Sequence, residues 1–188
     1  MQFIENQIFS KKDYILNPLP AAEYDNCTFN GCNFNSADIG GITFADCRFE
    51  DCNLTMAGVR HTALKNVIFI NCKMVGFNFN FCDSFLLEVA FKDCILHLSS
   101  FFGLKLKNTK FAGCDLREAD FAQADLTGAS FDGCDLSRAI FQDTILEKTD
   151  FRTARNYSID PERNRIKKGK FSKEGIAGLL DRYQIVIE

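Results

Sequence analysis

The side chains in this sequence that are best suited to chemistry are nine cysteines and two histidines. Cysteine and histidine bind zinc together, and cysteine pairs form disulfides in oxidising compartments. A zinc site needs short paired spacings with histidine partners, but six of the cysteines recur twenty residues apart in two trios: Cys32, Cys52, Cys72 and Cys94, Cys114, Cys134. This spacing favours buried thiols that pack as small apolar side chains, so we expect no metal site, no disulfide and no cofactor.

The two histidines, His61 and His97, fall at positions that we expect to point outward, in different parts of the chain. The sequence has no nucleophile elbow, phosphate-binding loop, dinucleotide fingerprint or zinc-protease motif. A tightly packed interior would also offer no cavity in which a pKa could be shifted for acid–base catalysis. We therefore expect that the protein is not an enzyme.

Carboxylates are concentrated between residues 111 and 150, where nine acids stand against three bases. The difference is −6, while the whole chain carries only −3. A regular negative surface can occupy a protein site that normally holds nucleic acid, whereas direct nucleic-acid binding needs a basic patch. We expect the acids to face a protein partner, and the alternative is that they only keep the exterior hydrated. They are Asp115, Glu118, Asp120, Asp125, Asp132, Asp135, Asp143, Glu147 and Asp150.

The element that must position these residues is a repeat of five. From Leu86 to Phe151, leucine and phenylalanine alternate at every fifth position, and the residue two places before each is nearly always small. On an α-helix, residues five apart are rotated by ~140° net around the axis, so these side chains would point in all directions. On a continuous strand, residues five apart point to opposite faces. Neither element therefore places these side chains on one side. A chain that bends once per repeat does so, and four bends close one coil. The pattern predicts an all-β, four-sided coil with residues twenty apart stacked in ladders.

A second run with the same spacing extends from Tyr24 to Phe79. The step from Phe79 to Leu86 is seven residues, which places two extra residues between the runs. We expect five parts: a capping strand or lead-in over 1–20, a first coiled segment over 21–79, a connector over 80–85, a second coiled segment over 86–155 and a C-terminal cap over 156–188.

Both ends of such a coil need a cap, because an open coil exposes unpaired backbone groups. Residues 1–9 alternate like a strand and can pair with the first coil. Ser172 can N-cap a short capping helix at about 173–183, followed by a strand over 184–187. Apolar residues of this cap would cover the last coil and pair with a second copy in a homodimer: Ile176, Leu179, Leu180, Tyr183, Ile185 and Ile187.

Four apolar residues should point outward and can rest under the terminal elements or form an interface: Phe85, Phe102, Ile140 and Ile145. The first residues lack the basic and apolar segments of a secretion signal. No apolar run approaches the ~20 residues of a membrane span. We expect a cytoplasmic protein without membrane contact.

The repeats resemble the pentapeptide repeat family, whose motif is A-(D/N)-L-x-x. The stretch GCDLREADFAQADLTGASFDGCDLSRAIF matches it almost repeat for repeat. The resemblance implies a right-handed quadrilateral parallel β-helix, a pentapeptide repeat solenoid, over about residues 21–155. The opening AEYDNCTFNGCNF, the mid-chain frame break and the ending IDPERNRIKKGKFSKEGIAGLLDRYQIVIE are similar to the branch that contains the quinolone-resistance (Qnr) proteins and the microcin immunity protein.

Members of that branch are dimers whose acidic rods resemble duplex DNA and bind the type II topoisomerases DNA gyrase or topoisomerase IV. The resemblance implies that the acids of 111–150 face such an enzyme, that 173–187 forms the dimerising cap, and that the protein modulates the enzyme or protects it from quinolones or peptide poisons. Quinolone-protecting members often carry inserted loops, and no such loop fits here, so an inhibitor or immunity protein is equally open. The alternative is a structural scaffold that binds an unrelated partner through its outward apolar residues.

Overall fold

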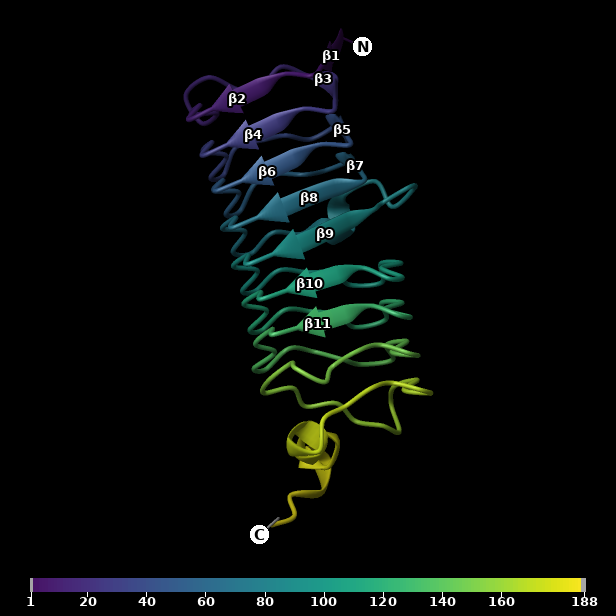
Figure 1. The fold of residues 1–188 in the computed structure, drawn as a ribbon. Helices are drawn as coiled ribbons and strands as arrows, with labels where there is room; N and C mark the ends of the chain where they lie inside the picture. The colour runs from purple at the N-terminus through teal and green to yellow at the C-terminus, as the bar shows by residue number, and fades with distance from the viewer. Residues whose placement is uncertain (1, 187–188) are drawn as a thin grey trace.

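The computed structural model describes residues 2–186, which form a rod built from one continuous coil (Figure 1). Each turn of the coil lies on the preceding one, so that Phe29 pairs with Phe49 in parallel register, twenty residues later. The fold is the all-β, right-handed quadrilateral parallel β-helix that the repeats and the family resemblance predict. The N-terminus and the C-terminus lie at opposite ends of the rod (Figure 1).

The coil has four sides, which we number in chain order. In one turn their central residues are Leu126 on side 1, Phe131 on side 2, Leu136 on side 3 and Phe141 on side 4. Side 1 carries a four-stranded sheet of β1 (Gln2–Glu5), β3 (Ala22–Asp25), β5 (Thr43–Ala45) and β7 (Ala63–Lys65). Side 2 carries a seven-stranded sheet of β2 (Ile8–Ser10), β4 (Thr28–Asn30), β6 (Arg48–Glu50), β8 (Val67–Ile70), β9 (Val89–Lys92), β10 (Lys110–Ala112) and β11 (Ser130–Asp132). Sides 3 and 4 are joined by isolated β-bridges.

The interior is filled by the central residues of the repeats. The ring of Phe111 stacks between those of Phe91 and Phe131, with centroids 5.1 and 4.9 Å away. Side 4 meets side 2 edge to face, as between Phe111 and Phe121, whose planes are inclined by 85°. Aromatic rings favour both geometries. Together with buried leucines such as Leu116, these stacks confirm the predicted ladders.

The register changes in the middle of the rod. Ala63 pairs with Asp83, twenty residues later, whereas residues of β8 pair with residues of β9 that lie twenty-two later. The short 3-10 helix η1 (Phe79–Phe81) still belongs to the regular coil. The two extra residues therefore lie within 84–88, later than the connector expected at 80–85.

Leu86 is placed differently from the sequence expectation. It should be the first inward leucine of the second run, but its side chain is 60% exposed and its φ is +60°. Leu87 packs against the core instead. Only Leu86 continues the five-residue frame, and the frame carries no information on where the chain leaves the coil.

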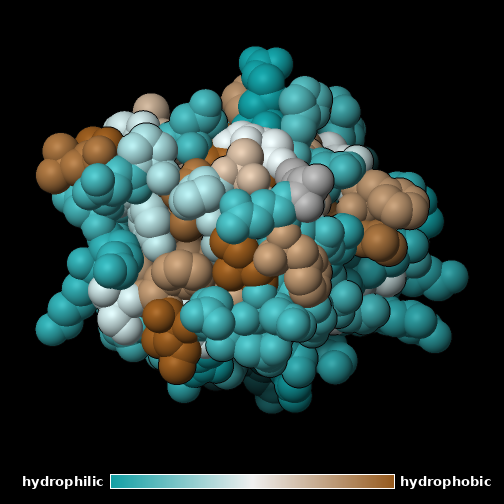
Figure 2. Space-filling model, turned by 90° about the horizontal axis from the view of Figure 1, so that it is seen from above, coloured by the Kyte–Doolittle hydropathy of each residue, from teal (hydrophilic) through white to brown (hydrophobic). Residues whose placement is uncertain are grey.

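The N-terminal segment forms the first coil. β1 pairs with β3, with Gln2 opposite Ala22, and β2 pairs with β4, with Ile8 opposite Thr28. The predicted pairing of the first residues is confirmed, but they make a coil of their own, and the stack begins before residue 21. Seen from this end (Figure 2), apolar side chains gather near the middle, and hydrophilic ones make up most of the outline.

The coil also continues beyond residue 155, because Ile145 pairs with Arg165 and Asp150 pairs with Lys170. Two 3-10 helices follow, η2 (Glu174–Leu179) and η3 (Asp181–Tyr183), where the sequence predicts one helix over 173–183. Residues 184–186 form no strand, and the predicted strand residue Ile187 lies outside the described residues. In the described part, no helix is long and apolar enough to cross a membrane.

Two glycines explain why the cap is short and tight. A Cβ on Gly175 would lie 2.2 Å from the Tyr157 hydroxyl, and one on Gly178 would lie 2.2 Å from the Tyr157 carbonyl oxygen. Glycine has low helix propensity, so the contact with Tyr157 determines the local conformation. The Ser172 hydroxyl accepts a hydrogen bond from Gly175 N–H at 3.0 Å, whereas the N-cap residue of η2 is Lys173, one residue later than predicted.

Candidate interaction surface

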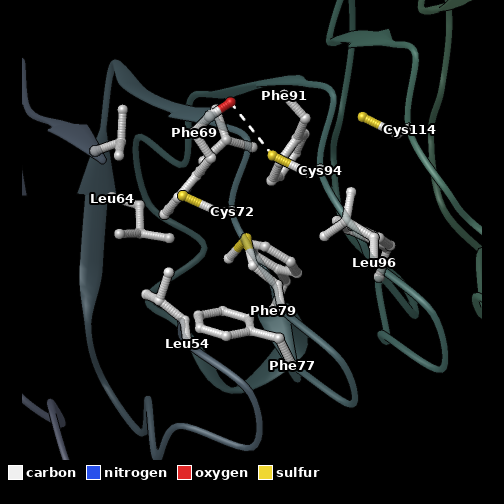
Figure 3. Close-up of a cluster of buried hydrophobic side chains, with 14 of the residues drawn as sticks. Leu54, Leu64, Phe69, Cys72, Phe77, Phe79, Phe91, Cys94, Leu96 and Cys114 are labelled. Atoms are coloured by element: carbon white, nitrogen blue, oxygen red, sulfur yellow. Dashed lines mark hydrogen bonds between the residues drawn. The ribbon is translucent and has the colours of Figure 1, made fainter. Parts of the chain in front are cut away.

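The nine cysteines are all buried and free. Cys72, Cys94 and Cys114 follow one another along the interior (Figure 3). The Cys94 thiol donates to the Phe69 carbonyl oxygen at 3.4 Å, a contact drawn in Figure 3. Burial raises the pKa of Cys47 to about 12, which keeps its thiol protonated at neutral pH. The prediction that the cysteines pack inside is therefore confirmed.

The two histidines lie on the exterior, on different sides of the coil. His61 follows the centre of side 4, whereas His97 lies on side 3, with Nε2 3.6 Å from Glu118 Oε1. Among residues 2–186, no group of three or more histidine, cysteine or acidic side chains is placed to hold a metal ion.

The acids of 111–150 surround the rod and do not share one side. A step of five residues moves to the next side, and a step of twenty returns to the same one, as the bridge between Asp115 and Asp135 shows. By side, they are Asp125 and Glu147 on side 1, Asp132 and Asp150 on side 2, Asp115, Glu118 and Asp135 on side 3, and Asp120 and Asp143 on side 4.

Five of these nine acids are ion-paired. The pairs are Asp115–Arg117 at 2.7 Å, Glu118–Arg138, Asp125–Lys107 at 3.3 Å, Glu147–Arg165 at 2.7 Å and Asp150–Arg152 at 2.7 Å. Exposed pairs of this kind contribute little to stability, but each reduces the outward negative field. Within the described residues the other four acids form no ion pair: Asp120, Asp132, Asp135 and Asp143.

Two of the unpaired acids lie across the corner between sides 2 and 3. The Thr153 hydroxyl donates to Asp132 Oδ1 at 2.6 Å, and Asn156 Nδ2 donates to Asp135 Oδ1 at 3.0 Å. At Asp135, burial would raise the pKa, but hydrogen bonds from Ser137 and Asn156 outweigh it and lower the pKa. Neutral donors thus fix these carboxylates while leaving their charge available.

The cap residues divide into an inward and an outward set. Leu179 packs against the core and Leu180 is half-buried. Ile176, Tyr183 and Ile185 are exposed at the tip of the rod. An outward apolar set is what a dimerising cap would need, and the homodimer stays a prediction.

Among the outward apolar residues, Phe85, Phe102 and Ile140 are exposed, and Ile145 is half-buried. Several others were not singled out from the sequence, although each falls at an outward or corner position: Ile68, Phe81, Ile95 and Leu98. Nor were four lysines that line a groove beside the register shift: Lys65, Lys105, Lys107 and Lys110. The run KLKNTK at 105–110 carried that signal.

Two family models match the chain. The model of pentapeptide repeats matches residues 99–138 and 114–152 with 8 copies, and the model of a pentapeptide repeat region matches residues 22–85. The register shift at 84–88 lies where the second of these matches ends. No curated protein matches the sequence significantly.

Solved structures share the fold at low sequence identity. Full-length QnrB1, a plasmid-mediated fluoroquinolone resistance protein, has a TM-score of 0.62 at 16% identity, covering 97% of this chain and 100% of QnrB1. A trypsin-treated QnrB1 variant has a TM-score of 0.54 at 20% identity, covering 100% of this chain and 92% of that one. HetL from the cyanobacterium Nostoc sp., a pentapeptide repeat protein involved in heterocyst differentiation regulation, has a TM-score of 0.44 at 19% identity, covering 93% of this chain and 91% of HetL.

Proposed function

Because this chain belongs to the pentapeptide repeat family, we propose that it is a non-enzymatic, DNA-mimicking protein that binds a type II topoisomerase. DNA gyrase or topoisomerase IV would receive the acids of 111–150 at a surface where it holds DNA. Binding there would modulate the enzyme or protect it from quinolones or peptide poisons. The likeness in fold to QnrB1, a fluoroquinolone resistance protein, supports this choice of partner.

The observation that carries the proposal is the density of negative charge along the rod. Residues 111–150 fill two coils and carry a net −6, so each coil contributes −3. With ~4.8 Å between successive coils, this is one negative charge per ~1.6 Å of axis. Duplex DNA carries one per ~1.7 Å. In formal charge these two coils therefore match the linear charge density of the polymer that a topoisomerase binds, and ion pairs with Lys107, Arg152 and Arg165, outside this range, offset part of it.

The match is confined to a short segment. Residues 151–173 hold eight bases and two acids, so the next coils have the opposite sign. The duplex-like part is thus ~10 Å long, less than a third of a DNA turn. Such a segment competes for a local set of phosphate-binding side chains and leaves the rest of the DNA path free, which suits a modulator.

The test is gyrase supercoiling and topoisomerase IV decatenation, each with and without ciprofloxacin or a peptide poison. We expect the wild-type protein to change at least one activity. Replacing the four unpaired acids by asparagine keeps their hydrogen-bonding oxygens, reduces the net charge of 111–150 from −6 to −2 and should remove most of the effect. The variant is D120N/D132N/D135N/D143N, and its matched control, before the register shift, is D25N/D38N/D51N/D83N.

The two enzymes and the poisons separate the possible outcomes. Inhibition without drug indicates an inhibitor, and restored activity only with drug indicates protection. No effect on either enzyme would contradict the proposal. An equal loss in the control variant would show that only total charge matters, which also contradicts a contact through 111–150.

The second candidate function is a scaffold for an unrelated protein, favoured by exposed apolar residues on side 4. Phe102 is 43% exposed and Ile140 is 48% exposed, and both lie on that side. Such binding would be insensitive to salt, abolished by Phe102→Ser and unchanged in the four-asparagine variant. The topoisomerase contact would instead weaken with salt, persist in Phe102→Ser and be lost in the four-asparagine variant.

The proposal places the protein in the cytoplasm with the chromosome and, through its cap, in a homodimer. Ile176 and Ile185 provide the exposed apolar surface at the tip. In I176E/I185E, light scattering should show a monomer where the wild type is a dimer. A wild-type monomer would contradict the dimer without affecting the topoisomerase contact.

A further inference from the structure

A groove opens at the corner between sides 1 and 2, beside the register shift. It is lined by β8, by the start of β9 and by residues 105–110 of the following coil. The loop 84–88 projects from the rod just before β9, on the right-hand side of the rod in Figure 1. Phe85 and Leu86 on this loop are exposed, so the chain has left the path of side 1 at this point. No regular strand follows β7 on this side. Asp83 still bridges Ala63, and Glu88 N–H donates to the Leu64 oxygen at 3.0 Å, but the chain between these two contacts bulges out of the coil.

The backbone hydrogen bonds locate the gap. In the next coil, Asp125 N–H donates to the Leu104 oxygen at 2.8 Å, and the Asp125 oxygen accepts from Leu106 N–H at 2.7 Å. Lys105 holds the same position one coil earlier, but within residues 2–186 neither its N–H nor its carbonyl has a backbone partner. The sheet of side 1 correspondingly ends at β7. An open strand edge of this kind pairs readily with an added extended chain.

The charges around this edge are mainly positive. Four of the residues that line the groove are lysines and two are acids. Lys107 lies 3.3 Å from Asp125, whereas Lys65, Lys105 and Lys110 form no ion pair with any described residue. Lys105 and Lys107 are two residues apart and project outward together, which is the spacing of alternate side chains on a strand.

We propose that this groove binds an extended acidic segment of a partner protein, which adds a strand along Lys105–Lys107. The N–H and carbonyl of Lys105 pair with the backbone of the segment. Its carboxylates, at alternate positions, face the lysines, and the apolar residues between them pack against Leu87. Nucleic acid suits the groove less well, because no aromatic side chain lines it for base stacking and the free groups are backbone donors and acceptors. This proposal does not depend on the topoisomerase contact.

The probe is a fluorescein-labelled, end-capped octapeptide of alternating aspartate and valine, and fluorescence anisotropy measures its binding to the full chain. We expect saturable binding that K105E/K107E weakens at least about tenfold. The matched control is K148E/K168E, which makes the same charge change at the same corner. There the ladder is continuous, since Lys148 N–H donates to the Lys167 oxygen at 3.0 Å, and binding should be unchanged.

Two further measurements test strand addition itself. Hydrogen exchange at the Lys105 amide should slow when the peptide is added. A peptide with proline in place of its two central valines should bind at least about tenfold more weakly, because proline cannot donate to a ladder. Equal binding of the proline peptide, unchanged exchange, or equal losses in the two lysine variants would overturn the proposal. The proposal would also be overturned if an oligothymidylate with the same charge as the peptide bound more tightly than the peptide and lost this binding in K105E/K107E.

Discussion

Phe111 offers the most direct measurement of what holds the rod together. Its side chain is fully buried and stacks between Phe91 and Phe131, at centroid distances of 5.1 and 4.9 Å. It also meets Phe101 and Phe121 edge to face, at 5.7 and 5.8 Å. Replacing Phe111 by alanine therefore removes one ring from four aromatic contacts in three successive coils.

The expected cost follows from the buried area. A buried phenylalanine ring removes ~150 Å² of apolar surface from water, which at ~25 cal/mol per Å² contributes ~4 kcal/mol. Phenylalanine-to-alanine changes in rigid cores cost ~3–5 kcal/mol. The backbone hydrogen bonds between coils hold the neighbouring rings in place, so these rings cannot move in to fill the cavity. We therefore expect Phe111→Ala to lower the free energy of unfolding by ~4 kcal/mol.

Urea unfolding followed by far-ultraviolet circular dichroism measures this loss. The control is Phe102→Ala, which removes a ring that is 43% exposed on the same part of the rod and should cost less than ~1 kcal/mol. Each coil contacts only its neighbours, so the Phe111 variant should also unfold less cooperatively. A loss below ~1.5 kcal/mol, or one equal to that of the control, would refute the reasoning.

Three further predictions concern single groups. Hydrogen bonds from Arg152 lower the pKa of Asp150 to about 2, below its unfolded value of ~3.9, so its contribution to stability is present above pH ~4 and is lost as the pH falls through about 2. In Arg152→Gln an NMR titration should show the Asp150 pKa raised, and an unchanged value would contradict the assignment. Burial raises the pKa of Cys47 to about 12, so mass spectrometry should detect maleimide labelling at pH 7 only in denaturant, and labelling of the folded protein would argue against its burial. Gly178→Ala would place a Cβ 2.2 Å from the Tyr157 oxygen, so limited proteolysis should cut the cap faster than in wild type, and equal rates would show that the cap adapts.

The interior could be predicted because side-chain size alone specifies it. Each central position must fill one side of a narrow coil, and each position two residues earlier must be small, which Phe131 and Ala129 satisfy as well as Leu116 and Cys114. A period of five leaves no other regular structure that would bury these residues together. The ladders, the buried thiols and the stacking of Asp115 on Asp135 therefore follow from spacing.

The ends and the register shift could not be placed in the same way. Whether Leu86 or Leu87 packs inward depends on where the chain rejoins the coil after β7, which hydrophobicity does not encode. The helical spacing of the cap was present in the sequence, but the tertiary contact of Gly175 and Gly178 with Tyr157 produces 3-10 turns. In the cap, a contact made elsewhere in the molecule overrides the local pattern.

The five-residue period also explains why acids that cluster in the sequence do not share a side. Outward positions five apart, such as Asp115, Asp120 and Asp125, turn a corner each time, and only positions twenty apart return to the same side. A short acidic stretch therefore becomes a belt around the rod. The charges of all four sides together give the linear charge density that resembles duplex DNA, but each single side carries only some of these charges.

The belt is not equivalent in all directions. On side 1 it lies next to the lysines of the groove, so a partner approaching there meets both signs of charge. On side 4 the exterior positions between residues 99 and 143 include the unpaired Asp120 and Asp143 and the exposed Phe102 and Ile140, without a lysine or arginine. The topoisomerase and scaffold hypotheses thus converge on side 4, since both unpaired charge and exposed apolar surface are found there. What separates them is whether carboxylates or rings supply the binding energy, and the salt dependence of binding measures that difference.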